Sequence, residues 1–159
     1  MRVKLFDSIV SPCLLYACST WALTREQEQR LTTVQRRMLR AMFARHFRRV
    51  SLESWPNYIS EVTHNAEEIY QQHGGEAWVL MHRKRKWRFA ARLASIQDGR
   101  WSCRLLSWRP VHARGRSVGR PCRRWSDDFC DLVGGDWLII ASDLVLWSAL
   151  EDGFVHKCS

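Results

Sequence analysis

Several common sequence signals are missing from this chain, and each absence argues against a class of protein. The six cysteines form no C-x-x-C pair, and the histidines are not spaced as zinc ligands around them. No apolar run approaches the roughly 20 residues of a membrane-spanning helix. The motifs of P-loop enzymes, α/β-hydrolases, zinc proteases and dinucleotide-binding folds are absent too. We therefore expect no metal, cofactor, membrane or small-molecule substrate, and no catalysis by this chain alone.

The cysteines and the N-terminus bear on where the protein resides. Cysteines without close pairs are typical of thiols in a reducing compartment. Asp7 and Pro12 interrupt the apolar N-terminal run, so we do not interpret it as a secretion signal. We expect an intracellular protein, nuclear or cytoplasmic.

Basic and acidic residues are distributed unevenly along the chain. Residues 1–124 hold 24 of the 25 lysines and arginines against 9 of the 16 acidic residues, a net charge of +15. Residues 125–159 hold one lysine against seven acidic residues, a net charge of −6. This split predicts a polyanion-binding body followed by an acidic segment that folds back onto it or points away.

The most basic stretch covers residues 100–125, with eight arginines, three tryptophans, two glycines, two prolines and no acidic residue. The glycines and prolines predict an extended or turn-rich connector over about residues 97–124. Guanidinium groups without nearby carboxylates commonly bind phosphate, which their planar fork matches. Nucleic acid is therefore the first partner to consider.

Hydrophobic periodicity predicts an all-α fold, a small bundle of five to six helices. We expect helices over about residues 3–22, 24–46, 58–72 and 76–96, and an acidic helical pair within 126–151. Thr24 and Gln27 form a capping box that begins the second helix. Asp136 is placed to cap the last helix. Two consecutive glycines divide the chain into units 1–73 and 76–159.

The spacing of apolar residues also predicts which helix faces are buried. In the first helix the inward residues are Phe6, Ile9, Val10, Cys13, Leu14, Ala17 and Trp21. In the second they are Leu31, Val34, Met38 and Met42, with Arg36, Arg37 and Arg40 on the opposite side. Such an arginine face binds a partner or is simply solvated; eight arginines against two glutamates in residues 25–49 favour a partner.

The adjacent residues Asp127 and Asp128 have two interpretations. Paired aspartates hold magnesium in polymerases, but there the pair lies in a hairpin between apolar strands. Here the pair precedes an apolar helical stripe, where carboxylates complement the helix dipole. We interpret the pair as the start of a helix.

Four sequence blocks, in order, resemble the region that follows the polymerase core in LINE-type (non-LTR) retrotransposon reverse transcriptases. They are D-S-I-V-S-P-C-L-L-Y at 7–16 with Trp21, R-R-M-L-R at 36–40, R-K-W-R-F-A at 85–90 and G-R-P-C-R-R-W-S-D-D at 119–128. The family patterns are D-S-x-x-x-P-x-L-L-Y-G-x-E-x-W, an arginine-rich helix, R-x-R-W-x-G-H and G-R-P-x-x-R-W-x-D-D. Ala17 stands where the family has glycine, and Ala90 and Ala91 stand where Gly-His is common.

The resemblance implies a helical thumb and C-terminal region that helps to hold an RNA template or an RNA/DNA primer duplex. The catalytic motifs would lie upstream, so the chain resembles a fragment of an RNA-directed DNA polymerase, and the polymerase core is a second expected partner. The expected phosphate contacts are Arg36, Arg37, Arg40, Arg85, Lys86, Arg88, Arg116, Arg120, Arg123 and Arg124.

Two tryptophans of the basic stretch, Trp101 and Trp108, either stack on unpaired bases or pack in a core. The leading hypothesis is thus a non-catalytic nucleic-acid-binding fragment, with binding dominated by arginine–phosphate contacts. The alternative is a degenerate or co-opted helical module that contacts proteins and has no nucleic-acid function.

Overall fold

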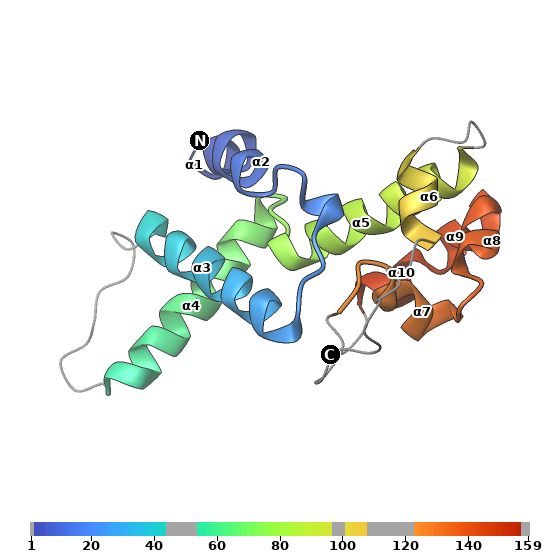
Figure 1. Ribbon diagram of the computed structural model, residues 1–159. Coiled ribbons are helices and arrows are strands. Elements are labelled where there is room, and N and C mark those ends of the chain that lie inside the picture. Colours follow the sequence, from blue (N-terminus) through green and yellow to red (C-terminus); the bar gives the residue numbers. More distant parts are fainter. Residues whose placement is uncertain (1, 44–53, 97–100, 108–122, 157–159) are drawn as a thin grey trace. The chain divides into compact units, whose positions relative to one another are not determined.

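The computed structural model describes residues 2–43, 54–96, 101–107 and 123–156, and every regular element in these ranges is helical (Figure 1). The predicted all-α fold is confirmed. Residue contacts divide the chain into two compact units: residues 1–17 with 23–82, and residues 18–22 with 83–159. The sequence predicted the division at residues 73–76. The observed boundary lies between His82 and Arg83, inside the helix α5 (Trp78–Ser95). None of the described helices combines the length and apolar composition that crossing a membrane requires.

For the N-terminal segment, the sequence predicted a helix over about residues 3–22 that Pro12 would kink or split. The structure has a series of short helices, one of which begins at Ser11. They are α1 (Arg2–Leu5), the π-helical turn η1 (Phe6–Val10), α2 (Ser11–Leu14) and the 3-10 turn η2 (Cys18–Thr20). A π-helical turn adds one residue to the helical repeat and therefore rotates the following residues around the axis. This rotation explains why Ile9 is 57% exposed while Ser11, Leu15 and Cys18 are buried. The predicted inward positions Cys13 and Ala17 are exposed as well.

Ala17, in the turn after α2, has a positive φ of 52°. An L-residue in this region pays about 1–2 kcal/mol of steric strain that glycine avoids. The retrotransposon family that the chain resembles has glycine at this position. We therefore expect Ala17→Gly to raise the free energy of unfolding by about 0.5–1 kcal/mol. Denaturant unfolding measures the change, and Ala41→Gly, inside a helix, is the control because it should lower stability by a similar amount. Equal destabilisation by both changes would contradict the strain.

Two longer helices, α3 (Arg25–Phe43) and α4 (Trp55–Gln72), pack side by side in the first unit (Figure 1). The predicted capping box is confirmed: the Thr24 backbone N–H donates to Gln27 Oε1 at 2.8 Å, and the Gln27 N–H donates to Thr24 Oγ1 at 3.3 Å. Helix α4 begins at Trp55 and not at the predicted residue 58. Pro56 lies in its first turn, where a proline's missing N–H and fixed φ suit a helix start.

The buried face of α3 differs from the predicted one. Its buried residues are Gln35, Leu39 and Phe43, whereas Val34 and Met38 are exposed. Gln35 can be buried because its amide is satisfied: Nε2 donates to the Glu76 carbonyl at 3.1 Å, and Oε1 accepts from the Trp78 N–H at 2.9 Å. Hydrophobicity alone could not identify this position, because its burial depends on partners far along the chain.

Aromatic and polar side chains form the core of the first unit. The ring of Phe6 stacks on Trp78 with centroids 5.5 Å apart. Trp78 Nε1 donates to Ser11 Oγ at 2.8 Å, Ser11 Oγ donates to Asp7 Oδ1 at 3.3 Å, and Tyr70 Oη donates to the same carboxylate oxygen at 2.5 Å. Burial, and then the bond to Asp7, raises the pKa of Tyr70. Two residues of the first resemblance block, Asp7 and Ser11, therefore hold this core together.

The second unit contains most of α5 (Trp78–Ser95) and five shorter helices. These are α6 (Trp101–Ser107), α7 (Asp127–Val133), α8 (Trp137–Ser142), α9 (Leu144–Ala149) and α10 (Glu151–Val155). Trp87 and Trp147 stack with centroids 3.6 Å apart, and each indole N–H donates to the other residue's carbonyl at 3.0 Å. Phe129, Trp137 and Phe154 complete the aromatic core.

Two predictions for the second unit are wrong in detail. Residues 101–107 were assigned to an extended connector but form α6; the glycines and prolines of the basic stretch all lie at 110–121. The helix predicted to run to residue 151 ends at Ser142. Asp143 then caps α9, accepting from the Val145 and Leu146 N–H groups at 3.0 and 3.1 Å, while Asp136 makes no capping bond.

Candidate nucleic-acid interface

Helix α3 displays three of the predicted arginines on its outer sides. With Gln35, Leu39 and Phe43 buried, neighbouring positions in the helix point outward or toward α4. Arg36 Nε donates to Glu67 Oε1 of α4 at 2.8 Å, and Arg40 Nη1 donates to Thr63 Oγ1 at 2.8 Å. The side chain of Arg36 remains 47% exposed. Arg37 is exposed on the neighbouring side of α3.

Arg36 and Arg40 line an open polar groove of about 430 Å³ between α3 and α4. The other lining residues are three hydroxyl side chains, one imidazole and one carboxylate: Thr33, Ser60, Thr63, His64 and Glu67. The two guanidinium groups outnumber the one carboxylate, so the lining carries an excess of positive charge. The groove can therefore accept an anion.

The α4 residues of this groove were not identified from the sequence, although a signal was present. Ser60, Thr63, His64 and Glu67 follow the i, i+3, i+4, i+7 spacing that places residues on one side of a helix. These four residues are polar, and the apolar periodicity that predicts buried helix faces does not include them. A polar stripe on one side of α4, beside an arginine stripe on α3, would have indicated the groove.

Lys86 is not on the surface. Its side chain is 0% exposed, and its ammonium group pairs with Asp128 and lies 5.5 Å from the ring centroids of both Trp125 and Phe129. Arg123 also donates to Asp128. Burial alone would raise the pKa of Asp128, but the hydrogen bonds from Lys86 and Arg123 outweigh burial and hold that pKa below its ordinary value. In this arrangement Lys86 cannot reach a phosphate.

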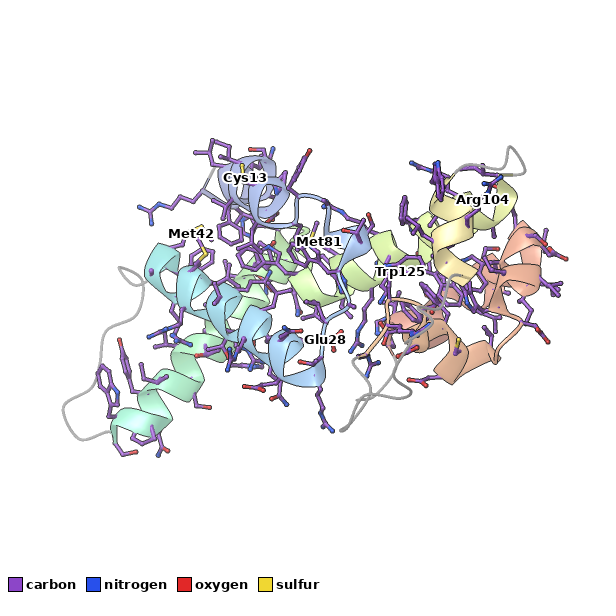
Figure 2. The ribbon with its side chains drawn as sticks, viewed as in Figure 1. Cys13, Glu28, Met42, Met81, Arg104 and Trp125 are labelled. Atoms are coloured by element: carbon purple, nitrogen blue, oxygen red, sulfur yellow. The ribbon has the colours of Figure 1, made fainter. Side chains whose placement is uncertain are left out.

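This ion pair joins two of the resemblance blocks, R-K-W-R-F-A and G-R-P-C-R-R-W-S-D-D. Trp125, labelled in Figure 2, contacts Phe129 and Trp137 edge to face, and its indole donates to the Ser19 carbonyl at 2.7 Å. The Asp127 carboxylate accepts from the Arg124 N–H at 2.7 Å, and α7 begins at Asp127. The predicted helix start is confirmed. Among the described residues, no three His, Cys, Asp or Glu side chains gather as metal ligands.

Three other basic candidates in the described part of the second unit, Arg85, Arg88 and Arg124, lie at the surface. Arg88 Nε donates to Glu151 Oε1 at 3.0 Å, and its side chain is 69% exposed. Arg85 and Arg124 are exposed. Burial raises the pKa of the Cys18 thiol, and a hydrogen bond from Arg85 offsets part of that rise.

Of the two tryptophans proposed for base stacking, the structure describes one, Trp101. Trp101 of α6 is 74% exposed, and the Arg104 guanidinium lies 5.6 Å from its ring centroid (Arg104 is labelled in Figure 2). Its side chain is thus not packed into a core, and base stacking stays a prediction. Arg116, Arg120 and Trp108 fall outside the described residues.

Comparison with known proteins links the chain to mobile elements. The chain is 30% identical, over 94% of its length, to a Caenorhabditis elegans protein named "Putative uncharacterized transposon-derived protein". It spans about half (53%) of that protein's length. No protein-family model matches the chain, and no solved structure matches it. The similarity indicates a transposon-related origin.

Proposed function

We propose that this chain is a non-catalytic, nucleic-acid-binding region descended from a LINE-type reverse transcriptase. It holds an RNA template or a primer duplex beside the polymerase core. The similarity to a transposon-derived protein supports the mobile-element origin. The four resemblance blocks and their order support the reverse-transcriptase family.

The observation that carries the proposal is the arginine face of α3. Arg36, Arg37 and Arg40 lie within five residues of one helix, two of them on an open groove. The Arg36–Glu67 ion pair is partly exposed, and such pairs contribute little to stability and exchange readily for other partners. The arginines can therefore bind phosphate oxygens while the helices stay folded.

The second unit adds further contacts. Exposed Arg85, Arg88 and Arg124 extend the basic surface of that unit. Lys86 and Arg123 are left out of the proposed contact set because Asp128 binds both. Arg116 and Arg120 of the connector stay in the set, and Trp101 is the candidate platform for an unpaired base.

We expect labelled single-stranded RNA and an RNA/DNA duplex to bind at low salt. The logarithm of the association constant should fall linearly with the logarithm of salt concentration, because each neutralised phosphate releases counterions. With the three α3 arginines engaged, the slope on single-stranded RNA should be about −2 or steeper. Fluorescence anisotropy at several salt concentrations measures it.

Absence of binding at low salt, or binding whose strength does not change with salt, would contradict the proposal. Either result, with the chain folded by circular dichroism, would favour the alternative of a protein-contacting module without nucleic-acid function.

A further inference from the structure

The α3–α4 groove offers more than a basic surface, and we infer that it is a binding site for one phosphodiester group, whose affinity is set by competition with Glu67. The inference rests on the proposed function for its natural ligand, the backbone of a nucleic acid. The site itself is defined by its own residues and can be tested with inorganic phosphate.

The hydrogen-bond donors of the groove are organised around Arg36 and Arg40. These residues are four apart, so their side chains leave the same side of α3. Thr63 Oγ1 donates to the Ile59 carbonyl at 2.6 Å and accepts from Arg40 Nη1 at 2.8 Å, so it orients the Arg40 guanidinium instead of donating to a ligand. Because the guanidinium is planar, this hydrogen bond to Thr63 also fixes the orientation of its other N–H groups. A planar guanidinium held in this way can bind two phosphate oxygens at once.

The α4 side of the groove supplies further donors. Ser60 carries a hydroxyl group and His64 an imidazole N–H, and both line the cavity. Thr33, in contrast, donates its hydroxyl proton to the Gln29 carbonyl at 2.8 Å. The donors available to an anion are therefore two guanidinium groups, one hydroxyl and one imidazole. A volume of about 430 Å³ is ample for a phosphate group with bound water.

Glu67 already supplies an anion to this groove. Its Oε1 accepts from Arg36 Nε at 2.8 Å, in the position where a phosphate oxygen would be bound. Its side chain is 33% exposed, so the carboxylate can swing toward solvent when a stronger anion arrives. Glu67 thus competes with the ligand for Arg36. Its negative charge also repels a phosphate group in the groove, although solvent screens part of this repulsion.

The test is a titration of the wild-type chain and of matched variants with inorganic phosphate. The chemical shifts of backbone amides and side chains, measured by NMR, report the binding. Glu67→Gln should tighten phosphate binding about tenfold, because it removes the competing charge and frees Arg36. Glu68→Gln removes the same charge one residue away, outside the groove, and should change the affinity less than about twofold. Arg40→Gln should weaken phosphate binding at least about tenfold, while Arg37→Gln should not.

Three results would overturn the inference: no shift of groove residues at millimolar phosphate, equal effects of Glu67→Gln and Glu68→Gln, or equal effects of Arg40→Gln and Arg37→Gln. A second arm with a short RNA oligonucleotide separates this inference from the proposed function. Phosphate binding in the groove without oligonucleotide binding would support the site and contradict the proposed function. Oligonucleotide binding that leaves the groove unshifted would support the function and contradict the site.

Discussion

Replacing Asp128 by asparagine is expected to lower the free energy of unfolding by about 3–5 kcal/mol. The Lys86 ammonium group is fully buried and pairs with this carboxylate. Asparagine keeps the shape of the side chain but removes the carboxylate charge that the buried ammonium group binds. Removing one charge of a buried pair is far more costly than replacing both by apolar groups.

Chemical denaturation followed by tryptophan fluorescence measures this loss. The matched control is Asp131→Asn, because Asp131 is 55% exposed and lies 3.8 Å from Arg123, so its loss should change stability by less than about 1 kcal/mol. The double variant Lys86→Met with Asp128→Leu replaces both buried charges by apolar groups and should recover most of the stability. Similar losses in Asp128→Asn and Asp131→Asn would mean that the pair is not buried.

The same pair gives a pH dependence with a defined sign. Because the pKa of Asp128 is lowered in the folded chain, its contribution to stability is complete above the unfolded value of about 3.9. That contribution is lost as the pH falls through the lower, folded pKa. The wild-type chain should therefore lose stability below about pH 4 by a component that Asp128→Asn lacks.

The second large effect is expected at Gly75. A Cβ atom built there would lie 2.3 Å from Tyr70 Cε2, well inside van der Waals contact. Tyr70 is 3% exposed and its hydroxyl is bound to Asp7, so the ring has little freedom to move away. We expect Gly75→Ala to lower the free energy of unfolding by about 2–3 kcal/mol, the upper part of the range for overpacking.

Gly135→Ala is the control for this change, because a Cβ at Gly135 would meet no atom within 4 Å and its φ is not in the left-handed region. Thermal unfolding monitored by circular dichroism compares the two variants. A Gly75→Ala chain as stable as Gly135→Ala would show that Tyr70 does not occupy the place described here.

Local signals in the sequence identified the helices well. The Thr24–Gln27 capping box and the helix start at Asp127 depend on residues within three or four positions of each other, and both are confirmed. The all-α fold follows from the same kind of information. The interruption at Pro12 follows from the sequence, because α2 begins at Ser11. The π-helical turn over Phe6–Val10 was not predicted, because it rotates the N-terminal face without any glycine or proline within it.

Burial of polar residues was the main feature that the sequence could not predict. Gln35 and Lys86 are both buried although their side chains are polar or charged. Each is satisfied by partners more than 40 residues away, the Glu76 and Trp78 backbone for Gln35 and Asp128 for Lys86. The family resemblance placed Lys86 among the expected phosphate contacts, together with the neighbouring Arg85 and Arg88. Only the three-dimensional arrangement separates the lysine that supports the core from the arginines around it.

The most direct test of nucleic-acid binding by α3 is the salt dependence of RNA binding by a variant with Arg36, Arg37 and Arg40 all changed to glutamine. Arg30→Gln, whose arginine pairs with Glu26 on the same helix, is the control. We expect the triple variant to bind single-stranded RNA more weakly at low salt, with a log–log slope shallower than that of the wild-type chain by about 2. The control should keep most of the wild-type slope. A folded triple variant with wild-type affinity and slope would contradict the proposed role of these arginines.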